Sequence, residues 1–567
     1  MRHTRNRTLV TAGAVALAIV AAVQSAPAAP STTAQRGVHS ARVRVLRVGK
    51  WHGVSGQYKT IQAAANAAKP GDWILVGPGD YHERADHALS GRPNATTSGG
   101  AVYLTKSGVH LRGMDRNRVV VDGAKPGTGR CPAGESAQDF GPLGKDGKSL
   151  GRNGVEVWKA SGVSVENLTA CNFLDGNGGG GNQIWFNGGD GSGKIGMGAF
   201  RGAYLSATTT FFKTGAPAGS YGIFSSNTRG PGIFTQSYAS NMDDSSFYVG
   251  ACRPDCNQVL DHVHAQGSTL GLSSTNVGGR VSIQNSEWDR NKTGLVTNSQ
   301  NNDDAPEPQD GSCVNGGTGP TGTHSCTIWR NNYVHDNNNA DVPQSGTAGE
   351  GPVGTGMVIA GGRYDTIIGN RVVHNGSWGI LLVPFPDIGH PPAVAHCRGG
   401  VQTQTPDGQT ECVFDDWGNE VRSNTLSQNG FFGNPSNSDL AEISNLENPG
   451  NCWHDNVRPA AEGAVTSDPP AIQQTHGTCG QPNSGNPLTS PLGAEVACAT
   501  QLLADCPKAP GATYPRLSTV KLLPLPKQTS MSNPCKNVPS NPWCSPKHAK
   551  RPRDPDHDGD HDLPGQK

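Results

Sequence analysis

The 567-residue chain has a formal net charge of zero and contains 77 glycines but only 6% aromatic residues. The balanced charge provides no basic footprint for nucleic acid, and the low content of large apolar residues excludes several globular α/β cores at this length. This composition suits a narrow coil whose core is one stack of Val, Ile and Leu.

Residues 1–28 resemble a secretory signal peptide. Basic residues from Arg2 to Arg7 precede an apolar run over 9–23, and Ala26-Pro27-Ala28 offers a cleavage site. An uncleaved membrane anchor is the alternative. The pattern predicts a secreted, extracellular protein that has no contact with a membrane after cleavage, followed by an extended segment over 29–54.

Fourteen cysteines fit export to an oxidising compartment. Sequence neighbours are the first guess for pairing, although connectivity does not follow from spacing. The pairs are Cys252/Cys256, Cys313/Cys326, Cys397/Cys412, Cys498/Cys506 and Cys535/Cys544. Zinc at Cys252 and Cys256 is the alternative, but no second Cys or His pair lies at zinc-finger distance.

The segment from Tyr58 to Glu83 predicts a helix, a strand and a turn. Thr60 can cap a short helix, whose apolar face ends before Pro70-Gly71, and residues 73–76 form a strand. A helix in this place would cover the exposed apolar end of a coiled stack. The segment resembles the opening of pectate-lyase-like proteins, the right-handed parallel β-helix superfamily, and the resemblance extends over roughly residues 55–460.

Residues 280–382 repeat one pattern three times, from Val281, from Thr327 and from Thr366. Each copy has a β-branched run, an Asn and a polar corner, and the period of about 20–30 residues is typical of a solenoid with one short strand group per repeat. Together with the resemblance, this predicts an all-β protein. The expected fold is a right-handed parallel β-helix over 55–456, with an N-terminal capping helix and disulfide-bearing loops.

The pattern fades after Asn456. Residues 457–550 are rich in Pro, Ser and Cys and predict a loosely structured segment tied by disulfides, and residues 551–567 predict a disordered Asp/His tail.

Equivalent residues of successive windings should stack about 4.8 Å apart, so alignment of the copies predicts columns of side chains. An asparagine column is interpreted as structural, with stacked amides bonding one another; it holds Asn167, Asn285, Asn331, Asn370 and Asn424. Four positions on, the next column holds Met242, Gln266, Asp289, His335, His374 and Gln428. The column beside it holds Asp243, Gly267, Arg290, Asp336, Asn375 and Asn429.

The alignment makes Asp289, His335 and His374 neighbours and places Arg290 beside Asp336. A carboxylate beside imidazoles and a cation for a substrate carboxylate suit proton removal next to a uronic acid carboxylate. We therefore predict catalytic roles for Asp289, His335, Arg290, His374 and Asp243, with the first two in proton transfer. Substrate-binding roles are predicted for Asp336, Trp288, Tyr248 and Asp244. A coincidental cluster on solvent-facing polar corners is the alternative.

Asp243 and Asp244 also form an adjacent acid pair, as in β-helix glycosidases that hydrolyse pectin. The Gly-His-Gly and Arg-Ile-Lys motifs of those enzymes are absent, which argues against hydrolysis. Calcium on Asp243, with Asp244 or Asp289, is left open, and no cofactor or other metal ligand is assigned. His262 and His264 form a weak metal pair, in which His262 is interpreted as structural.

The sequence supports two functions. The first is a secreted, monomeric lyase or epimerase that acts on an acidic polysaccharide. The second is a non-catalytic extracellular glycan-binding or surface-structural protein, with exposed flat aromatics such as Trp288 or Trp378. His335 or His374 in a groove, with a shifted pKa, would favour the enzyme.

Overall fold

The computed structural model describes residues 43–84, 99–300, 308–387, 397–404, 408, 410–444, 450–481, 491–500 and 512–545. The predicted signal peptide and the Asp/His tail lie outside the described residues. No helix among the described residues is long and apolar enough to cross a membrane.

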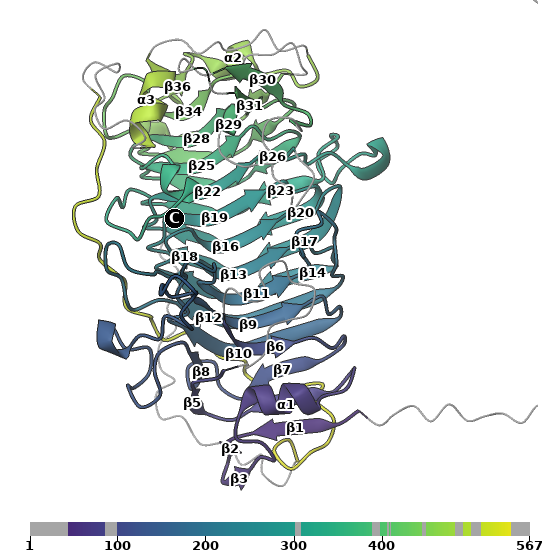
Figure 1. Ribbon diagram of the computed structural model, residues 1–567. Coiled ribbons are helices and arrows are strands. Elements are labelled where there is room, and N and C mark those ends of the chain that lie inside the picture. Colours follow the sequence, from purple (N-terminus) through teal and green to yellow (C-terminus); the bar gives the residue numbers. More distant parts are fainter. Residues whose placement is uncertain are drawn as a thin grey trace, which may run out of the picture. The chain divides into compact units, whose positions relative to one another are not determined.

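The described chain is a right-handed parallel β-helix, as predicted (Figure 1). A typical winding contributes two strands to a 20-stranded sheet and one to an 11-stranded sheet, so that the coil has three sides. The N-terminal windings contain β1 (Val45–Val48), β4 (Trp73–Val76), β5 (Gly79–Tyr81), β6 (Gly99–Leu104), β7 (His110–Gly113), β8 (Val119–Asp122), β9 (Arg152–Trp158), β10 (Val163–Cys171), β11 (Asn182–Asn187), β12 (Phe200–Thr208) and β13 (Tyr221–Ser226).

The middle and C-terminal windings follow the same order. They contain β14 (Gly232–Thr235), β15 (Tyr238–Ser240), β16 (Ser245–Gly250), β17 (Asp255–Asp261), β18 (His264–Gln266), β19 (Leu270–Thr275), β20 (Gly279–Gln284), β21 (Glu287–Asp289), β22 (Thr293–Asn298), β23 (Thr327–Arg330), β24 (Tyr333–His335), β25 (Thr355–Ala360), β26 (Asp365–Ile368), β27 (Arg371–Val373), β28 (Trp378–Val383), β32 (Glu420–Arg422), β33 (Thr425–Ser427), β34 (Ser438–Glu442), β35 (Cys452–His454) and β36 (Ser467–Asp468).

Two small antiparallel sheets lie outside the coil. They are formed by β2 (Lys50–Trp51) with β3 (Val54–Ser55), and by β29 (Phe385–Asp387), β31 (Thr410–Phe414) and β30 (Val401–Gln404). Short 3-10 turns occur at Glu135–Ala137, Val314–Gly316, Thr347–Glu350 and Ala460–Glu462.

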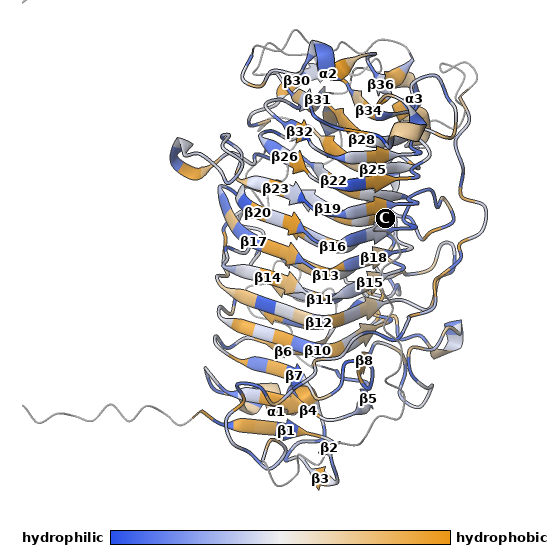
Figure 2. Ribbon diagram, turned by 180° about the vertical axis from the view of Figure 1, so that it is seen from behind, coloured by the Kyte–Doolittle hydropathy of each residue, from blue (hydrophilic) through white to orange (hydrophobic). Residues whose placement is uncertain are grey.

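Three-residue strands make up one side of the coil, and their side chains alternate between core and solvent. The central residues of five consecutive strands are fully buried: Ala265, Trp288, Val334, Val372 and Leu426. Hydropathy alternates in the same way along the strands (Figure 2). The first and third residues therefore point outward, and we call the outward side of β15, β18, β21, β24, β27 and β33 the short-strand face.

Left-handed residues turn the chain at both ends of each three-residue strand. The corner before the strand includes His262, Asn285 and Asn331, and the corner after it, here called the second corner, comprises Asn241, Gly267, Arg290, Asp336, His374 and Gln428. Asn and Gly adopt this conformation at low cost, which explains the polar corners read from the sequence.

The predicted asparagine column splits into two. Asn285 and Asn331 are exposed corner residues, whereas Asn370 and Asn424 belong to a buried ladder one position later. In that ladder each amide donates to the carbonyl oxygen of the next, at 2.8–2.9 Å, along Asn332, Asn370, Asn424 and Asn456. A second ladder connects Asn291, Asn337, Asn375 and Asn429 at 3.1–3.2 Å. The prediction that stacked amides are structural is confirmed, but the membership was wrong.

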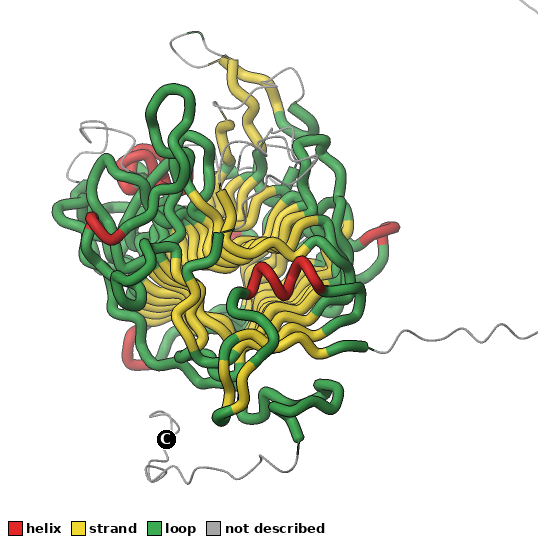
Figure 3. The backbone as a smooth tube through the Cα atoms, turned by 60° about the horizontal axis from the view of Figure 1, so that its bottom comes forward, coloured by secondary structure: helices red, strands yellow, loops and turns green. Residues whose placement is uncertain are grey.

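The capping helix is present as α1 (Ile61–Ala67), and it crosses the end of the coil in front of the first strands (Figure 3). The Thr60 side chain accepts a hydrogen bond from the Ala63 amide at 3.3 Å, as a helix cap. Ile61, Ala64 and Ala65 are buried against the core, so this prediction is confirmed.

Six disulfides lie among the described residues. Four join predicted neighbours, at Cys252–Cys256, Cys313–Cys326, Cys397–Cys412 and Cys535–Cys544. The other two were not predicted, and they join Cys131 to Cys171 and Cys452 to Cys479. Cys252 and Cys256 are therefore a disulfide and not zinc ligands.

The described residues after Asn456 include two short helices. These are α2 (Ile472–Thr475) and α3 (Leu492–Ala499), and α3 packs on the outward side of the 11-stranded sheet. Residues 512–545, which we call the strap, have no helix or strand and run back toward α1 along the windings (yellow in Figure 1).

Candidate functional site

The predicted register holds at the centre of the short-strand face. Asp289 of β21 pairs with His335 of β24, and Gln266 of β18 precedes them in the same column. His374 does not belong to this column, because Val373 occupies the position after His335. The third repeat is displaced by one residue, since Thr327 pairs with Asp365 and not with Thr366.

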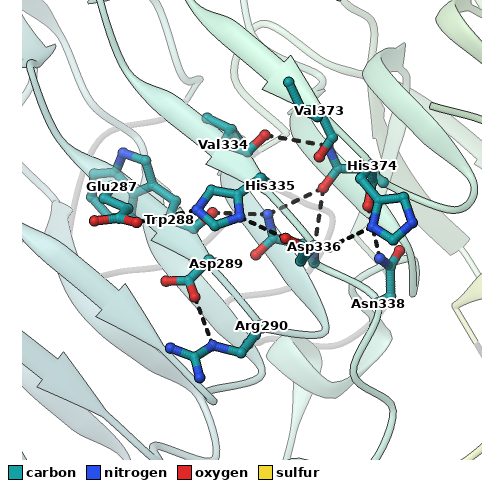
Figure 4. Close-up of polar contacts among 12 residues, drawn as sticks. Glu287, Trp288, Asp289, Arg290, Val334, His335, Asp336, Asn338, Val373 and His374 are labelled. Atoms are coloured by element: carbon teal, nitrogen blue, oxygen red, sulfur yellow. Dashed lines mark hydrogen bonds and ion pairs between the residues drawn. The ribbon is translucent and has the colours of Figure 1, made fainter. Parts of the chain in front are cut away.

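His374 instead reaches the cluster from the second corner. Its Nδ1 lies 2.5 Å from Asp336 Oδ1, while the other oxygen of Asp336 accepts from His335 Nδ1 at 2.7 Å (Figure 4). One carboxylate thus bridges two imidazoles from neighbouring windings. His374 Nε2 has no hydrogen-bond partner among the described residues, and 46% of the side chain is exposed.

Asp289 is the most buried member of the cluster, with 5% of its side chain exposed. Its oxygens accept hydrogen bonds from His264 Nε2 at 2.7 Å, Gln266 Nε2 at 3.0 Å and Arg290 Nε at 2.7 Å. Arg290 therefore pairs with Asp289, whereas the alignment had placed it beside Asp336. Its side chain is 53% exposed, and its terminal nitrogens point away from the cluster (Figure 4).

Glu287 was missed in the sequence, although it lies on the same face as Asp289. It is the first outward residue of β21, and its Oε1 accepts from His335 Nε2 at 3.2 Å. His335 is consequently held between two carboxylates, one on each ring nitrogen. Strand alternation applied to the aligned repeats provides the signal that would have identified Glu287 as a partner of His335 and His264 as a partner of Asp289.

The carboxylates around His335 determine its charge. Desolvation of the half-buried ring lowers the His335 pKa, but hydrogen bonds to Glu287 and Asp336 outweigh it and leave the pKa above the ordinary 6.5. Burial raises the Asp289 pKa and the bonds from His264 and Arg290 lower it, with a net decrease. Burial also raises the Asp336 pKa, and the two histidines reverse this to a net decrease. The two aspartates are ionised at neutral pH.

Aromatic rings flank the histidines. Tyr333 stacks on His335 with ring centroids 3.9 Å apart. The Arg371 guanidinium lies over the Tyr333 ring, 4.6 Å from its centroid. Phe431 stacks on His374 at 4.4 Å and is exposed. The short-strand face thus combines cations, carboxylates and flat rings, the groups that proteins use to hold an acidic sugar.

The substrate-binding role predicted for Trp288 is wrong. Trp288 is the central residue of β21 and lies fully buried in the core, with its indole nitrogen near Asn332. Trp378 is also fully buried. A tryptophan side chain in the core has no surface to offer a sugar.

Asp243, Asp244 and Tyr248 contact residues other than His335, Asp336 and His374. Asp243 is buried, and its carbonyl oxygen accepts from the Ser345 amide at 3.0 Å. Desolvation and the charge of Asp175 raise the Asp243 pKa to about 7. Asp244 accepts from the Tyr221 hydroxyl at 2.7 Å, and Tyr248 packs with Phe224 on the 11-stranded sheet.

One group of side chains in the cluster could hold a metal ion, but its ligand atoms are not those that calcium prefers. Asp243 and Asp289 occupy separate places, so a calcium site shared by these two is not supported. His264, Glu287 and Asp289 place ligand atoms within 4.8 Å of one another. This mixed nitrogen and oxygen set suits a transition metal better than calcium, which prefers oxygen ligands.

No family model matches the chain, and no curated protein matches it. The chain is similar to the solved mannuronan C-5 epimerase AlgE6 A-module of Azotobacter vinelandii, at 14% identity and TM-score 0.41, over 70% of this chain and 88% of that one. It is also similar to a mannuronic acid-specific polysaccharide family 6 lyase from human gut microbiota, at 11% identity and TM-score 0.37, over 73% and 80%. For the pectate lyase Pel9A the values are 12% and 0.32, over 68% and 76%.

Proposed function

We propose that the chain is an enzyme of acidic polysaccharides, which removes the proton next to a uronic acid carboxylate in a lyase or epimerase reaction. The observation that carries the proposal is the Asp336 carboxylate. It bridges His335 and His374 through their Nδ1 atoms and leaves His374 Nε2 exposed. A carboxylate on Nδ1 fixes the tautomer of an imidazole and directs the lone pair of Nε2 outward, as a general base requires.

Arg290 is proposed to bind the uronate carboxylate. Charge on that group rises when the neighbouring proton leaves, and a guanidinium beside it stabilises the resulting enolate. Arg290 Nε is occupied by Asp289, and the terminal nitrogens of the half-exposed side chain turn from their outward position toward the carboxylate when the uronate binds.

His335 is proposed to supply a positive charge and not the base. Both of its nitrogens face carboxylates, and these raise its pKa, so the ring takes up its second proton more readily than a free imidazole does. This charge keeps Glu287 and Asp336 ionised. His374 then takes the role of base that the sequence had assigned to Asp289 and His335.

Hydrolysis by paired carboxylates has less support. Asp243 is buried, and Asp244 has its oxygen on Tyr221, so these two residues do not flank an open groove.

The second candidate is a non-catalytic glycan-binding protein. The exposed Phe431 ring on His374 favours it, because flat rings bind sugar faces without chemistry. The buried Trp288 and Trp378 and the raised His335 pKa point the other way. Incubation with pectate, alginate and glycosaminoglycans in D₂O separates the two candidates, since an enzyme incorporates deuterium at the uronate carbon or forms an unsaturated, ultraviolet-absorbing product. Binding without either change would support the second candidate.

Secretion and a monomeric state are part of the proposal. The disulfides among the described residues fit an oxidising extracellular environment.

A further inference from the structure

The strap follows a defined path along the β-helix. It begins near Asn434, passes Asp341 and reaches the second corner at Asn241, then crosses to Asn117 and Asn167. It ends at the N-terminal cap, where Trp543 is buried and its indole N–H donates to the Val54 carbonyl at 3.0 Å.

Three asparagines hold the strap by its backbone. Asn241 accepts from the Leu523 amide at 2.9 Å and donates to the Leu523 carbonyl at 2.8 Å. Asn434 grips Thr513 in the same way, at 2.7 and 3.0 Å, and Asn117 grips Gln528, at 2.9 and 2.8 Å. Because each side-chain amide satisfies both backbone groups of one residue, it replaces the partner that a neighbouring strand would supply.

Further groups on the coil bind strap carbonyls and amides. Asp341 accepts from the amides of Ser518 and Thr519, at 2.8 and 3.1 Å. Arg112 donates to the carbonyls of Pro534 and Lys536, at 3.1 and 2.7 Å. These contacts are also to backbone atoms of the strap. They therefore favour an extended backbone and depend little on which side chains it carries.

Several strap side chains also contact the β-helix, among them Tyr514, Ser518 and Ser530. Leu523 packs over Gly267, where an added Cβ would lie 2.8 Å from Leu523 Cδ1. At the far end, Trp543 packs with Trp73, Leu75 and Met114, next to the disulfide Cys535–Cys544. The strap therefore has the composition of a peptide ligand, with backbone clamps along its length and anchoring side chains at a few places.

We propose that this side of the β-helix is a binding track for an extended peptide, and that the strap occupies it as an intramolecular ligand. The track reaches the short-strand face at β15. There Arg116 donates to the Gln236 carbonyl, which precedes β15, and to the Thr529 carbonyl of the strap. The candidate site lies on later windings of the same face. Departure of the strap would uncover the earlier windings.

The test uses the full chain with a specific protease sequence inserted before residue 512. After cleavage the fragment beginning at residue 512 should remain bound in native gel filtration, and a labelled synthetic peptide of residues 512–545, oxidised at Cys535 and Cys544, should exchange into the track. Asn241→Ala combined with Asn117→Ala removes four hydrogen bonds to the strap and should speed its release at least about tenfold.

Asn331→Ala is the matched control, because Asn331 is also a left-handed corner asparagine but does not touch the strap. A peptide with an N-methyl group on Leu523 tests the clamp without altering the β-helix, and it should compete at least about tenfold more weakly than one N-methylated at the exposed Leu517. Immediate loss of the cleaved fragment with no uptake of peptide would overturn the proposal. Equal competition by the two methylated peptides would also overturn it.

Discussion

Asp336 and His374 lie on neighbouring windings, and Asp336 Oδ1 accepts a hydrogen bond from His374 Nδ1 at 2.5 Å. Both residues have the left-handed conformation of the second corner. This pair leaves the exposed Nε2 of His374 without a hydrogen-bond partner among the described residues, and the proposed chemistry depends on it.

His374→Ala should lower turnover of a responsive polyuronate by about 10²–10⁴-fold, the usual contribution of a general base. His262→Ala is the control, because His262 is also a left-handed corner histidine beside an aspartate, 3.0 Å from Asp261. Initial rates of the two variants should be compared once their circular dichroism spectra show that both are folded like the wild-type protein. Equal losses in the two variants would remove His374 from the mechanism.

Arg290→Gln should reduce kcat/KM by about 10–100-fold, because a charge-assisted hydrogen bond to a carboxylate contributes about 1.5–3 kcal/mol. Arg280→Gln provides a matched comparison, since Arg280 has the same left-handed backbone, a similar exposure of 51% and an aspartate partner in Asp255. With a neutral methyl-ester substrate, the kcat/KM values of the two variants should be similar. The assignment is wrong if the ester and the acid respond alike.

His335 should make the protein more stable in mild acid. Its folded-state pKa lies above 6.5, so the contribution of the imidazolium is complete below the unfolded value and is lost as pH rises through the folded value. His335→Gln should therefore destabilise the protein more at about pH 5.5 than at about pH 8.5. Denaturant unfolding at the two pH values measures this, and a larger effect at the higher pH would contradict the ion-pair geometry.

The buried asparagine ladder should carry stability. Asn370→Ala removes the side chain that pairs with the Asn332 backbone and side-chain amides and with the Trp329 carbonyl, which should cost about 3 kcal/mol of unfolding free energy. Asn331→Ala, on the exposed corner one residue before the ladder, should cost far less. Similar losses from both would show that the amide stack has no special part in stability.

The sequence predicted the coil because its repeats carry the period directly. The pairing of Asp289 with His335 followed from aligning two copies that have the same spacing. The third copy was aligned one residue too late, because Thr366 resembles Thr327 in sequence. In the structure Asp365 is the residue that pairs with Thr327. A shift of one residue moved His374 from the strand column to the corner, where it meets Asp336.

The prediction for Trp288 did not apply strand alternation to the repeats: with Asp289 facing outward, the preceding residue of the strand faces inward. Another feature could not follow from the repeats. The contact of Asn241 with Leu523 spans 282 positions and belongs to no repeat, so the path of the strap required the structure.

The central claim is that the His374 imidazole removes a proton next to a uronate carboxylate, and deuterium incorporation tests it most directly. Polyuronates are incubated in D₂O with the wild-type protein, with His374→Ala and with His262→Ala, and the exchange of the uronate proton is followed by NMR. The account predicts exchange or the unsaturated product with the wild type and His262→Ala, and a loss of about 10²-fold or more with His374→Ala. Absence of both exchange and unsaturated product on every polyuronate that the wild-type protein binds would contradict it.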